Sequence, residues 1–144
     1  MSRLRIGIIG CGGIANGKHM PSLAKVKDCE MVAFCDLIEE RAVKARADYG
    51  KPEDKVYTDY RELLTMPELD AVITPSSWDA HVQICIDAMN AGKYVASEVG
   101  GACSVDECWE LVRTSQRTKE PCMLLENCCY GRSELALLNM VKQG

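Results

Sequence analysis

The chain has 144 residues, of which 47% are hydrophobic and 26% charged, and its formal net charge is −4. This length and balance predict one globular domain with a sizeable core. The acidic charge and the lack of a basic run argue against a nucleic-acid or anionic-membrane partner, and no apolar stretch reaches the length of a membrane span. Without a signal-peptide pattern, we expect a cytoplasmic protein.

Nine cysteines invite a disulfide or metal interpretation, which their spacing does not support. The count is odd, no C-x-x-C pair occurs, and the only histidines are His19 and His81. We therefore expect no metal, and reduced thiols as in the cytosol. For the adjacent Cys128 and Cys129 we favour packing over redox chemistry. Four cysteines in apolar patterns are expected to act as small hydrophobic groups: Cys11, Cys35, Cys85 and Cys122.

The first predicted element is an apolar strand over residues 5–9, which runs into a glycine turn and then a helix. The turn carries G-x-G-x-x-A at Gly10, Gly12 and Ala15, the dinucleotide-binding fingerprint with alanine in its third small position. Gly10 allows a sharp turn, Gly12 lets a pyrophosphate approach the backbone, and Ala15 lets the helix pack closely on the strand. The free N–H groups at the helix N-terminus supply an anion site.

A second apolar strand, over residues 28–36, ends in Asp36, about 20 residues beyond the fingerprint. An acidic group there can accept hydrogen bonds from the adenosine ribose hydroxyls, a role we favour over that of a helix cap. Because a carboxylate repels a 2′-phosphate, Asp36 favours NAD over NADP. Three basic residues nearby moderate this preference: Arg41, Lys44 and Arg46.

Strands and helices then alternate to the end of the chain. The helix after the glycine turn is expected to kink or divide at Pro21. Further helices are predicted at residues 39–49, 60–66, 79–90, 104–121 (opened by a capping box) and 133–142. Further strands are predicted at 55–57, 70–75, 93–98 and 122–126. This alternation is typical of an α/β fold: a Rossmann-type, doubly wound, mainly parallel six-stranded sheet with helices on both faces.

Four stretches carry a family pattern: I-G-I-I-G-C-G-G-I-A, the strand ending in Asp36, T-P-S-S-W-D-A-H, and A-G-K-Y-V-A-S-E. In them the chain resembles the N-terminal nucleotide-binding half of the Gfo/Idh/MocA oxidoreductase family. The resemblance implies an NAD(P)-binding Rossmann domain over residues 1–144, a fragment whose C-terminal substrate domain is absent. In the family the last stretch continues as E-K-P, with its lysine near the nicotinamide and substrate. Here it continues Glu98-Val99-Gly100, without the lysine.

Shorter signatures are similar to the NAD-dependent exo-α-N-acetylgalactosaminidases: W-x-x-H, E-V and E-N-C-C-Y-G-R, although the usual E-V-P of that branch reads E-V-G here. Such enzymes cleave a glycoside without net oxidation, because the hydride that NAD takes from the sugar is returned. The resemblance implies NAD contacts at Gly13, Ile14, Asp36, Trp78, His81, Glu98, Val99 and Asn127. The predicted cofactor site adds Gly10, Gly12 and, at the end of the fourth strand, Thr74.

Three functions follow as hypotheses. The first is the dinucleotide-binding domain of an NAD(P)-dependent oxidoreductase that transfers a hydride to or from a sugar or cyclic polyol. The second is an NAD-dependent glycosidase with recycled NAD, and the third is a non-catalytic NAD-binding module. Expected partners are NAD and a sugar-like substrate. Whether the protein forms a homo-oligomer stays an open question. No catalytic residue is assigned.

Several residues receive a structural interpretation. Trp109 is expected in the core, and His19 on the surface or as core filler. For Glu98 two interpretations stay open: a contact to the cofactor or a structural hydrogen-bond acceptor. Tyr130 and Arg132 are assigned no catalytic role. The apolar stripe of the last helix would normally pack on the sheet, with part exposed if a domain is missing: Leu135, Leu138 and Val141.

Overall fold

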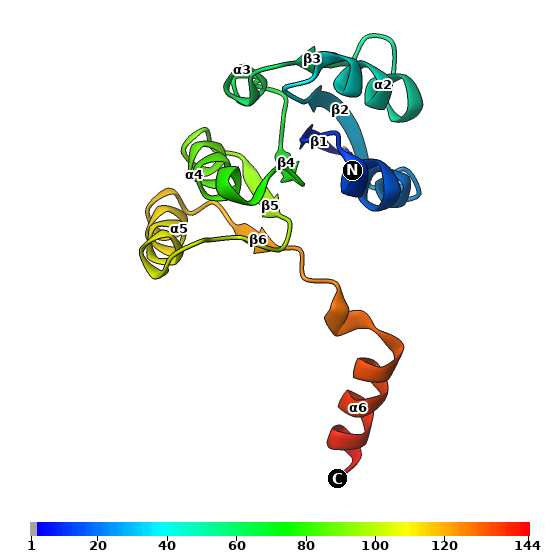
Figure 1. The fold of residues 1–144 in the computed structure, drawn as a ribbon, viewed down its shortest axis with the longest axis vertical. Coiled ribbons are helices and arrows are strands. Elements are labelled where there is room, and N and C mark those ends of the chain that lie inside the picture. The colour runs from blue at the N-terminus through cyan, green and yellow to red at the C-terminus, as the bar shows by residue number, and fades with distance from the viewer. Residues whose placement is uncertain (1–2) are drawn as a thin grey trace.

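The computed structural model describes residues 3–144. In this range the chain forms one sheet of six parallel strands in the order β3-β2-β1-β4-β5-β6 (Figure 1). The predicted doubly wound α/β fold is confirmed, and its sheet is parallel throughout. The strands are β1 (Leu4–Ile9), β2 (Cys29–Cys35), β3 (Lys55–Tyr57), β4 (Ala71–Thr74), β5 (Tyr94–Ser97) and β6 (Cys122–Leu124).

Helices cover both faces of this sheet and create two cores. Successive strand residues point to opposite faces, so the neighbours Ile8 and Ile9 belong to different cores. Ile8 and Phe34 pack beside α1 and α2, whereas Ile9 and Val72 pack beside α3 and α4. The helices are α1 (Met20–Leu23), α2 (Glu39–Tyr49), α3 (Tyr60–Leu64), α4 (His81–Asn90), α5 (Val105–Thr118) and α6 (Arg132–Gln143).

Local sequence signals set the helix ends. Pro21 lacks an N–H, and the helix before it widens over Ala15–His19, where the Met20 N–H bonds to the Ala15 oxygen. The predicted interruption at Pro21 is thus confirmed. The capping box is also confirmed: the Glu107 N–H donates to Ser104 Oγ at 3.2 Å and the Ser104 N–H to Glu107 Oε2 at 3.1 Å.

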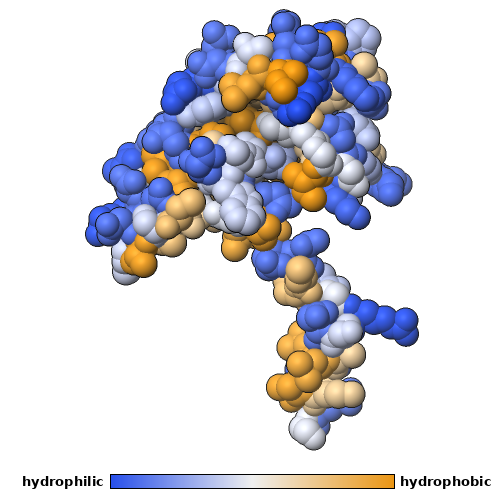
Figure 2. Space-filling view, in the orientation of Figure 1, coloured by the Kyte–Doolittle hydropathy of each residue, from blue (hydrophilic) through white to orange (hydrophobic). Residues whose placement is uncertain are grey.

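The C-terminal part departs from the predicted arrangement. Trp109 on α5 is 54% exposed, so its assignment to the core is wrong. An amphipathic pattern marks one face of a helix, but does not say whether another element covers it. No residue of α6 is buried: the helix stands away from the sheet (Figure 1), and Figure 2 shows apolar side chains gathered on it. Of the described helices, none is long and apolar enough to cross a membrane.

Candidate cofactor site

A cavity of about 430 Å³ opens where the strand order reverses, at the carboxyl ends of β1, β2 and β4. In an open parallel sheet this switch point is where ligands bind, and natural small-molecule pockets measure roughly 300–1,000 Å³. The cavity brings together residues that are far apart in sequence, among them Gly10, Gly12, Asp36, Ile38, Tyr60 and Ser76.

Gly10 makes the turn at the end of β1. Its φ is +103°, a left-handed conformation that favours glycine. A Cβ there would lie 3.0 Å from the Pro75 oxygen and from the Ser76 nitrogen, so the turn passes directly against the loop after β4. The Gly10 N–H donates to the Cys35 oxygen at 2.8 Å. The conformational reason predicted for glycine at this position is confirmed.

Gly12 and Gly13 face open space, since a Cβ built on either would meet no atom within 4 Å. Asn16 braces the turn beneath them: its Nδ2 donates to the Cys11 oxygen at 2.6 Å and to the Gly12 oxygen at 2.9 Å. Sequence reasoning missed Asn16, because the fingerprint leaves that position unspecified. The structure therefore holds the glycine backbone open without a side chain above it.

Asp36 is almost buried, with 9% of its surface exposed, and lies at the cavity wall. Its Oδ2 accepts from the Cys11 N–H at 2.8 Å, and its Oδ1 from the Ile38 N–H at 2.9 Å. A carboxylate offers about four acceptor positions, so each oxygen keeps capacity for a ribose hydroxyl. Asp36 thus ties the glycine turn to the end of β2 while facing the cavity.

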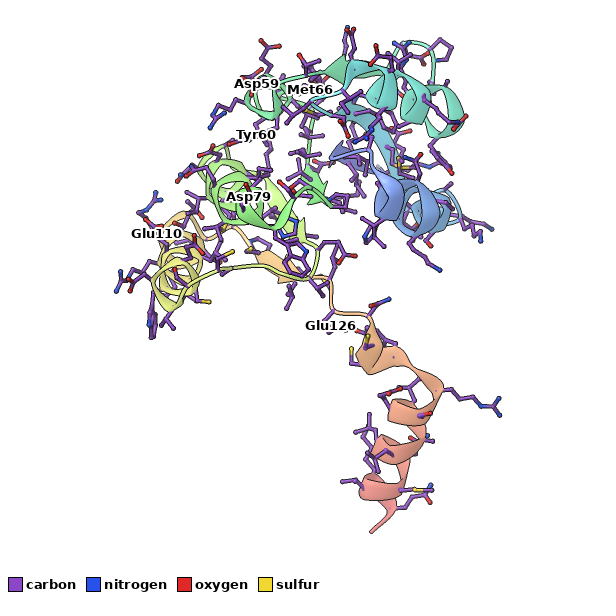
Figure 3. All side chains as sticks on the ribbon, viewed as in Figure 1. Asp59, Tyr60, Met66, Asp79, Glu110 and Glu126 are labelled. Carbon is purple, nitrogen blue, oxygen red and sulfur yellow. The ribbon has the colours of Figure 1, made fainter. Side chains whose placement is uncertain are left out.

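Beyond Asp36, the cavity wall includes an aromatic and a basic side chain, Tyr60 and Arg41. Tyr60 reaches from α3 toward α4 (Figure 3), where its hydroxyl donates to Asp87 Oδ2 at 2.7 Å. Burial and this hydrogen bond raise the pKa of Tyr60 to about 12, so the phenol stays neutral. Of the three basic residues predicted to moderate the cofactor preference, Arg41 lines the cavity, while Lys44 pairs with Asp48 at 2.6 Å.

Cys11 and Cys35 are buried next to this wall, Cys11 in the core beside α1 and α2 and Cys35 in the core beside α3 and α4. Burial raises the pKa of each to about 12, helped at Cys11 by the negative charge of Asp36. Their expected role as small hydrophobic groups is confirmed, as is the burial of Cys85. The preference for packing at Cys128 and Cys129 is wrong, because both are exposed.

Iodoacetamide at pH 8 is therefore expected to alkylate Cys103 rapidly and to spare Cys11 and Cys35 in the folded chain. A thiol with a pKa near 12 carries almost no thiolate below pH 10, so raising the pH to 9 should not change the pattern. Peptide mass spectrometry reports the sites, and the urea-unfolded chain, in which every cysteine reacts, is the control. Labelling of Cys11 at the rate of Cys103 would contradict this placement.

The predicted residues Thr74, the last of β4, and His81, the first of α4, are both fully buried. Thr74 Oγ1 lies 2.9 Å from Ser76 Oγ, and His81 Nε2 lies 3.2 Å from the Ser76 oxygen. Since a carbonyl oxygen only accepts, Nε2 is the donor of this hydrogen bond. Nδ1 is buried and has no hydrogen-bond partner among the described residues.

At the end of β5, Glu98 is held on both carboxylate oxygens. Oε2 accepts from the Val99 N–H at 2.7 Å, and Oε1 lies 2.7 Å from His19 Nε2. Both side chains are largely shielded from solvent. His19 thus joins the helix after the glycine turn to the end of β5, a role that sequence reasoning missed because no local pattern links residues 79 positions apart.

Of the eleven predicted site residues, Gly10, Gly12 and Asp36 line this cavity, and the other eight do not: Gly13, Ile14, Thr74, Trp78, His81, Glu98, Val99 and Asn127. Ile14 is exposed at the start of the first helix, and Trp78 is exposed at the start of the 3₁₀ turn Trp78–Ala80. Asn127 is exposed in the connection from β6 to α6, next to Glu126, which Figure 3 shows beyond the sheet. The structure therefore gathers the glycines, Asp36 and the strand ends, but leaves Asn127 apart from them.

The gathered residues fit a dinucleotide. Open backbone at Gly12 and Gly13, beside a helix N-terminus, suits a pyrophosphate. Asp36 keeps acceptor capacity for a ribose, and His81 Nδ1 is a buried polar atom without a hydrogen-bond partner among the described residues. In residues 3–144 no cluster of three or more histidine, cysteine, aspartate or glutamate side chains could hold a metal ion.

Comparison with known proteins agrees with this geometry. A glycosyl hydrolase family 109 protein 1 of Shewanella sp. (strain MR-4) is 40% identical over 151 residues, which cover 100% of this chain and 33% of that protein. The alpha-N-acetylgalactosaminidase of Shewanella oneidensis is 38% identical with the same coverage. The chain thus spans about a third of the length of the curated relatives it matches.

Solved structures share the fold. Scyllo-inositol dehydrogenase from Lactobacillus casei, with bound NAD(H) and scyllo-inositol, has a TM-score of 0.89 at 22% identity, over 99% of this chain and 42% of that one. Residues 4–125 match the family described as an oxidoreductase family with an NAD-binding Rossmann fold. The chain therefore belongs to the Gfo/Idh/MocA oxidoreductase family, of which it is an NAD-binding Rossmann domain.

Proposed function

We propose that this chain binds NAD for an NAD-dependent glycosidase of the α-N-acetylgalactosaminidase kind, in which the cofactor is recycled. The observation that carries the proposal is the 38–40% identity, over the whole chain, to glycosyl hydrolase family 109 proteins. Glu98-Val99-Gly100 also supports it, since the lysine of the E-K-P stretch of the wider family has no counterpart there.

Each part of the site has a binding role in this proposal. NAD, when bound, supplies an acceptor and donor of hydride. The open backbone at Gly12 and Gly13 would take the pyrophosphate, and Asp36 would accept from the adenosine ribose. Glu98, fixed by His19, would stand near the nicotinamide end, at the carboxyl edge of β5.

A net sugar or polyol dehydrogenase is the second candidate. It is favoured by the fold shared with scyllo-inositol dehydrogenase, at an identity that supports the architecture alone. The two candidates differ in what happens to NAD. The glycosidase returns its hydride within one turnover, whereas the dehydrogenase accumulates NADH.

The deciding experiment uses the complete product of the reading frame that contains this chain. We expect 4-nitrophenyl α-N-acetylgalactosaminide to release nitrophenol when NAD is present, without a rise in NADH absorbance at 340 nm. Steady NADH formation with a polyol or sugar would favour the dehydrogenase. NAD binding with neither activity would favour a non-catalytic module.

The cofactor preference gives a separate prediction for the chain itself. Calorimetric titration should show saturable NAD binding that is tighter than NADP binding, because Asp36 repels a 2′-phosphate. Asp36→Asn removes the negative charge. The preference for NAD over NADP, measured as the ratio of their dissociation constants, should fall about tenfold, or by about 1.4 kcal/mol. Arg41→Ala is the variant with the opposite expected effect. Arg41 lines the same cavity, and its loss should weaken NADP binding without changing NAD binding.

Two outcomes would count against this assignment. If the chain binds neither NAD nor NADP, it is not a dinucleotide-binding domain and Asp36 has no ribose to contact. An unchanged NAD/NADP ratio in Asp36→Asn would show that another group reads the ribose. A thermal unfolding curve for each variant separates these results from loss of the fold, since Asp36 also holds the Cys11 and Ile38 N–H groups.

A further inference from the structure

Gly100 and Trp78 form a contact that no other residue at position 100 could make. The φ of Gly100 is +95°, in the left-handed region. A Cβ there would lie 2.7 Å from Cδ1 and Cγ of the Trp78 indole and 2.8 Å from its Nε1. Since all three distances are shorter than real Cβ contacts, the indole occupies the space of the missing side chain.

This contact joins two loops at the carboxyl edge of the sheet. Trp78 follows Ser77, which lines the 430 Å³ cavity after β4, and Gly100 comes two residues after Glu98, at the end of β5. Gly100 also lines a second cavity of about 620 Å³ beside α5 and β6. The indole therefore stands between the two loops, held on one side by Gly100, while 67% of the residue remains exposed.

We propose that Gly100 is a positioning residue that fixes the Trp78 indole at the rim of the cofactor site, beside the carboxyl ends of β4 and β5. The inference rests on the proposed NAD binding. An exposed indole has rotational freedom, and the Gly100 backbone restricts it by packing against one side of the pyrrole ring. A ring held in place before the cofactor arrives loses less entropy when the cofactor binds.

The proposal gives a reason for the sequence E-V-G. Proline has its φ locked near −65°, so it cannot take the +95° that Gly100 adopts. A proline at position 100 would therefore change the loop and also collide with the indole. Residues 78 and 100 are a matched pair, and restoring the proline of the related E-V-P motif is expected to harm this chain.

The test uses Trp109→Phe as the parent, so that Trp78 is the only tryptophan. In it, Gly100→Ala and Gly100→Pro are each expected to red-shift Trp78 emission, to increase acrylamide quenching, and to weaken NAD binding about tenfold. Gly101→Ala is the matched control, because its Cβ would lie 3.5 Å from Leu124 Cδ1, an ordinary contact, at a φ that is not left-handed. It should leave emission and NAD affinity unchanged.

Trp78→Ala guards against an effect through folding. It should weaken NAD binding about as much as Gly100→Ala, and adding Gly100→Ala to it should cause no further loss. Unchanged emission in Gly100→Ala, or shifted emission with unchanged NAD affinity, would overturn the inference. Additive losses in the double variant would also overturn it. Failure of the parent itself to bind NAD would instead overturn the proposed function, while emission still reports on the contact.

Discussion

Gly12→Val is expected to weaken NAD binding about 100-fold, roughly 2.7 kcal/mol, without lowering the stability of the chain. A Cβ at position 12 meets no protein atom within 4 Å, so the folded chain has room for a larger side chain. That room is the open backbone where a pyrophosphate would bind, and valine would fill it. Calorimetry with NAD measures the loss, and urea unfolding measures the stability.

Gly10→Ala is the contrasting variant two residues away. Its Cβ would press on the backbone of Pro75 and Ser76 at 3.0 Å, in a left-handed conformation that alanine rarely adopts. We expect this change to lower stability by about 1–3 kcal/mol, with NAD binding lost as a consequence. Gly17→Ala, in the helix and with no atom within 4 Å of its Cβ, should affect neither property adversely.

The contrast between the two glycines separates folding from binding. If Gly12→Val destabilises the chain as much as Gly10→Ala, the space above Gly12 is not free in the folded protein. If Gly12→Val binds NAD like the original chain, the dinucleotide does not approach this backbone. Either result would contradict the placement of the pyrophosphate.

The features that could be predicted from the sequence depend on short-range patterns. The local pattern of hydrophobic residues predicts the alternation of strands and helices. From that alternation follow the parallel sheet and the edge at which its strands end. Gly10 and Asp36 were found because the fingerprint places both within one βαβ unit, where backbone geometry limits how they can be arranged. Their conformation and hydrogen bonds follow from that unit alone.

The features that could not be predicted depend on contacts between distant segments. His19 meets Glu98 across 79 positions, and Trp78 meets Gly100 across two loops. Trp109 was misplaced for a related reason, because its helical spacing identifies an apolar face, whereas burial depends on a neighbouring element. Sequence patterns therefore predict where the site lies, but not the contacts that hold its side chains.

Lys93 makes another contact between distant segments, and we expect its loss to lower the stability of the fold strongly. Its side chain is buried, with 7% of the residue exposed, just before β5. Nζ donates to the Met66 oxygen at 2.8 Å and to the Leu69 oxygen at 2.7 Å, and so fastens the loop between α3 and β4. Hydrogen bonds from a charged donor stabilise a fold by about 1.5–3 kcal/mol each.

Lys93→Met is expected to lower the free energy of unfolding by about 2–4 kcal/mol. Methionine keeps the apolar part of the side chain but lacks the N–H donors of Nζ. The carbonyl oxygens of Met66 and Leu69 are then left without a hydrogen-bond donor. Replacing a buried ion pair with apolar residues can be neutral, but here the acceptors belong to the backbone and remain. Lys55→Met, at an exposed strand position, is the matched control and should stay within about 0.5 kcal/mol. Equal urea midpoints for the two variants would mean that these carbonyls find other donors, so that Lys93 does not fasten the loop.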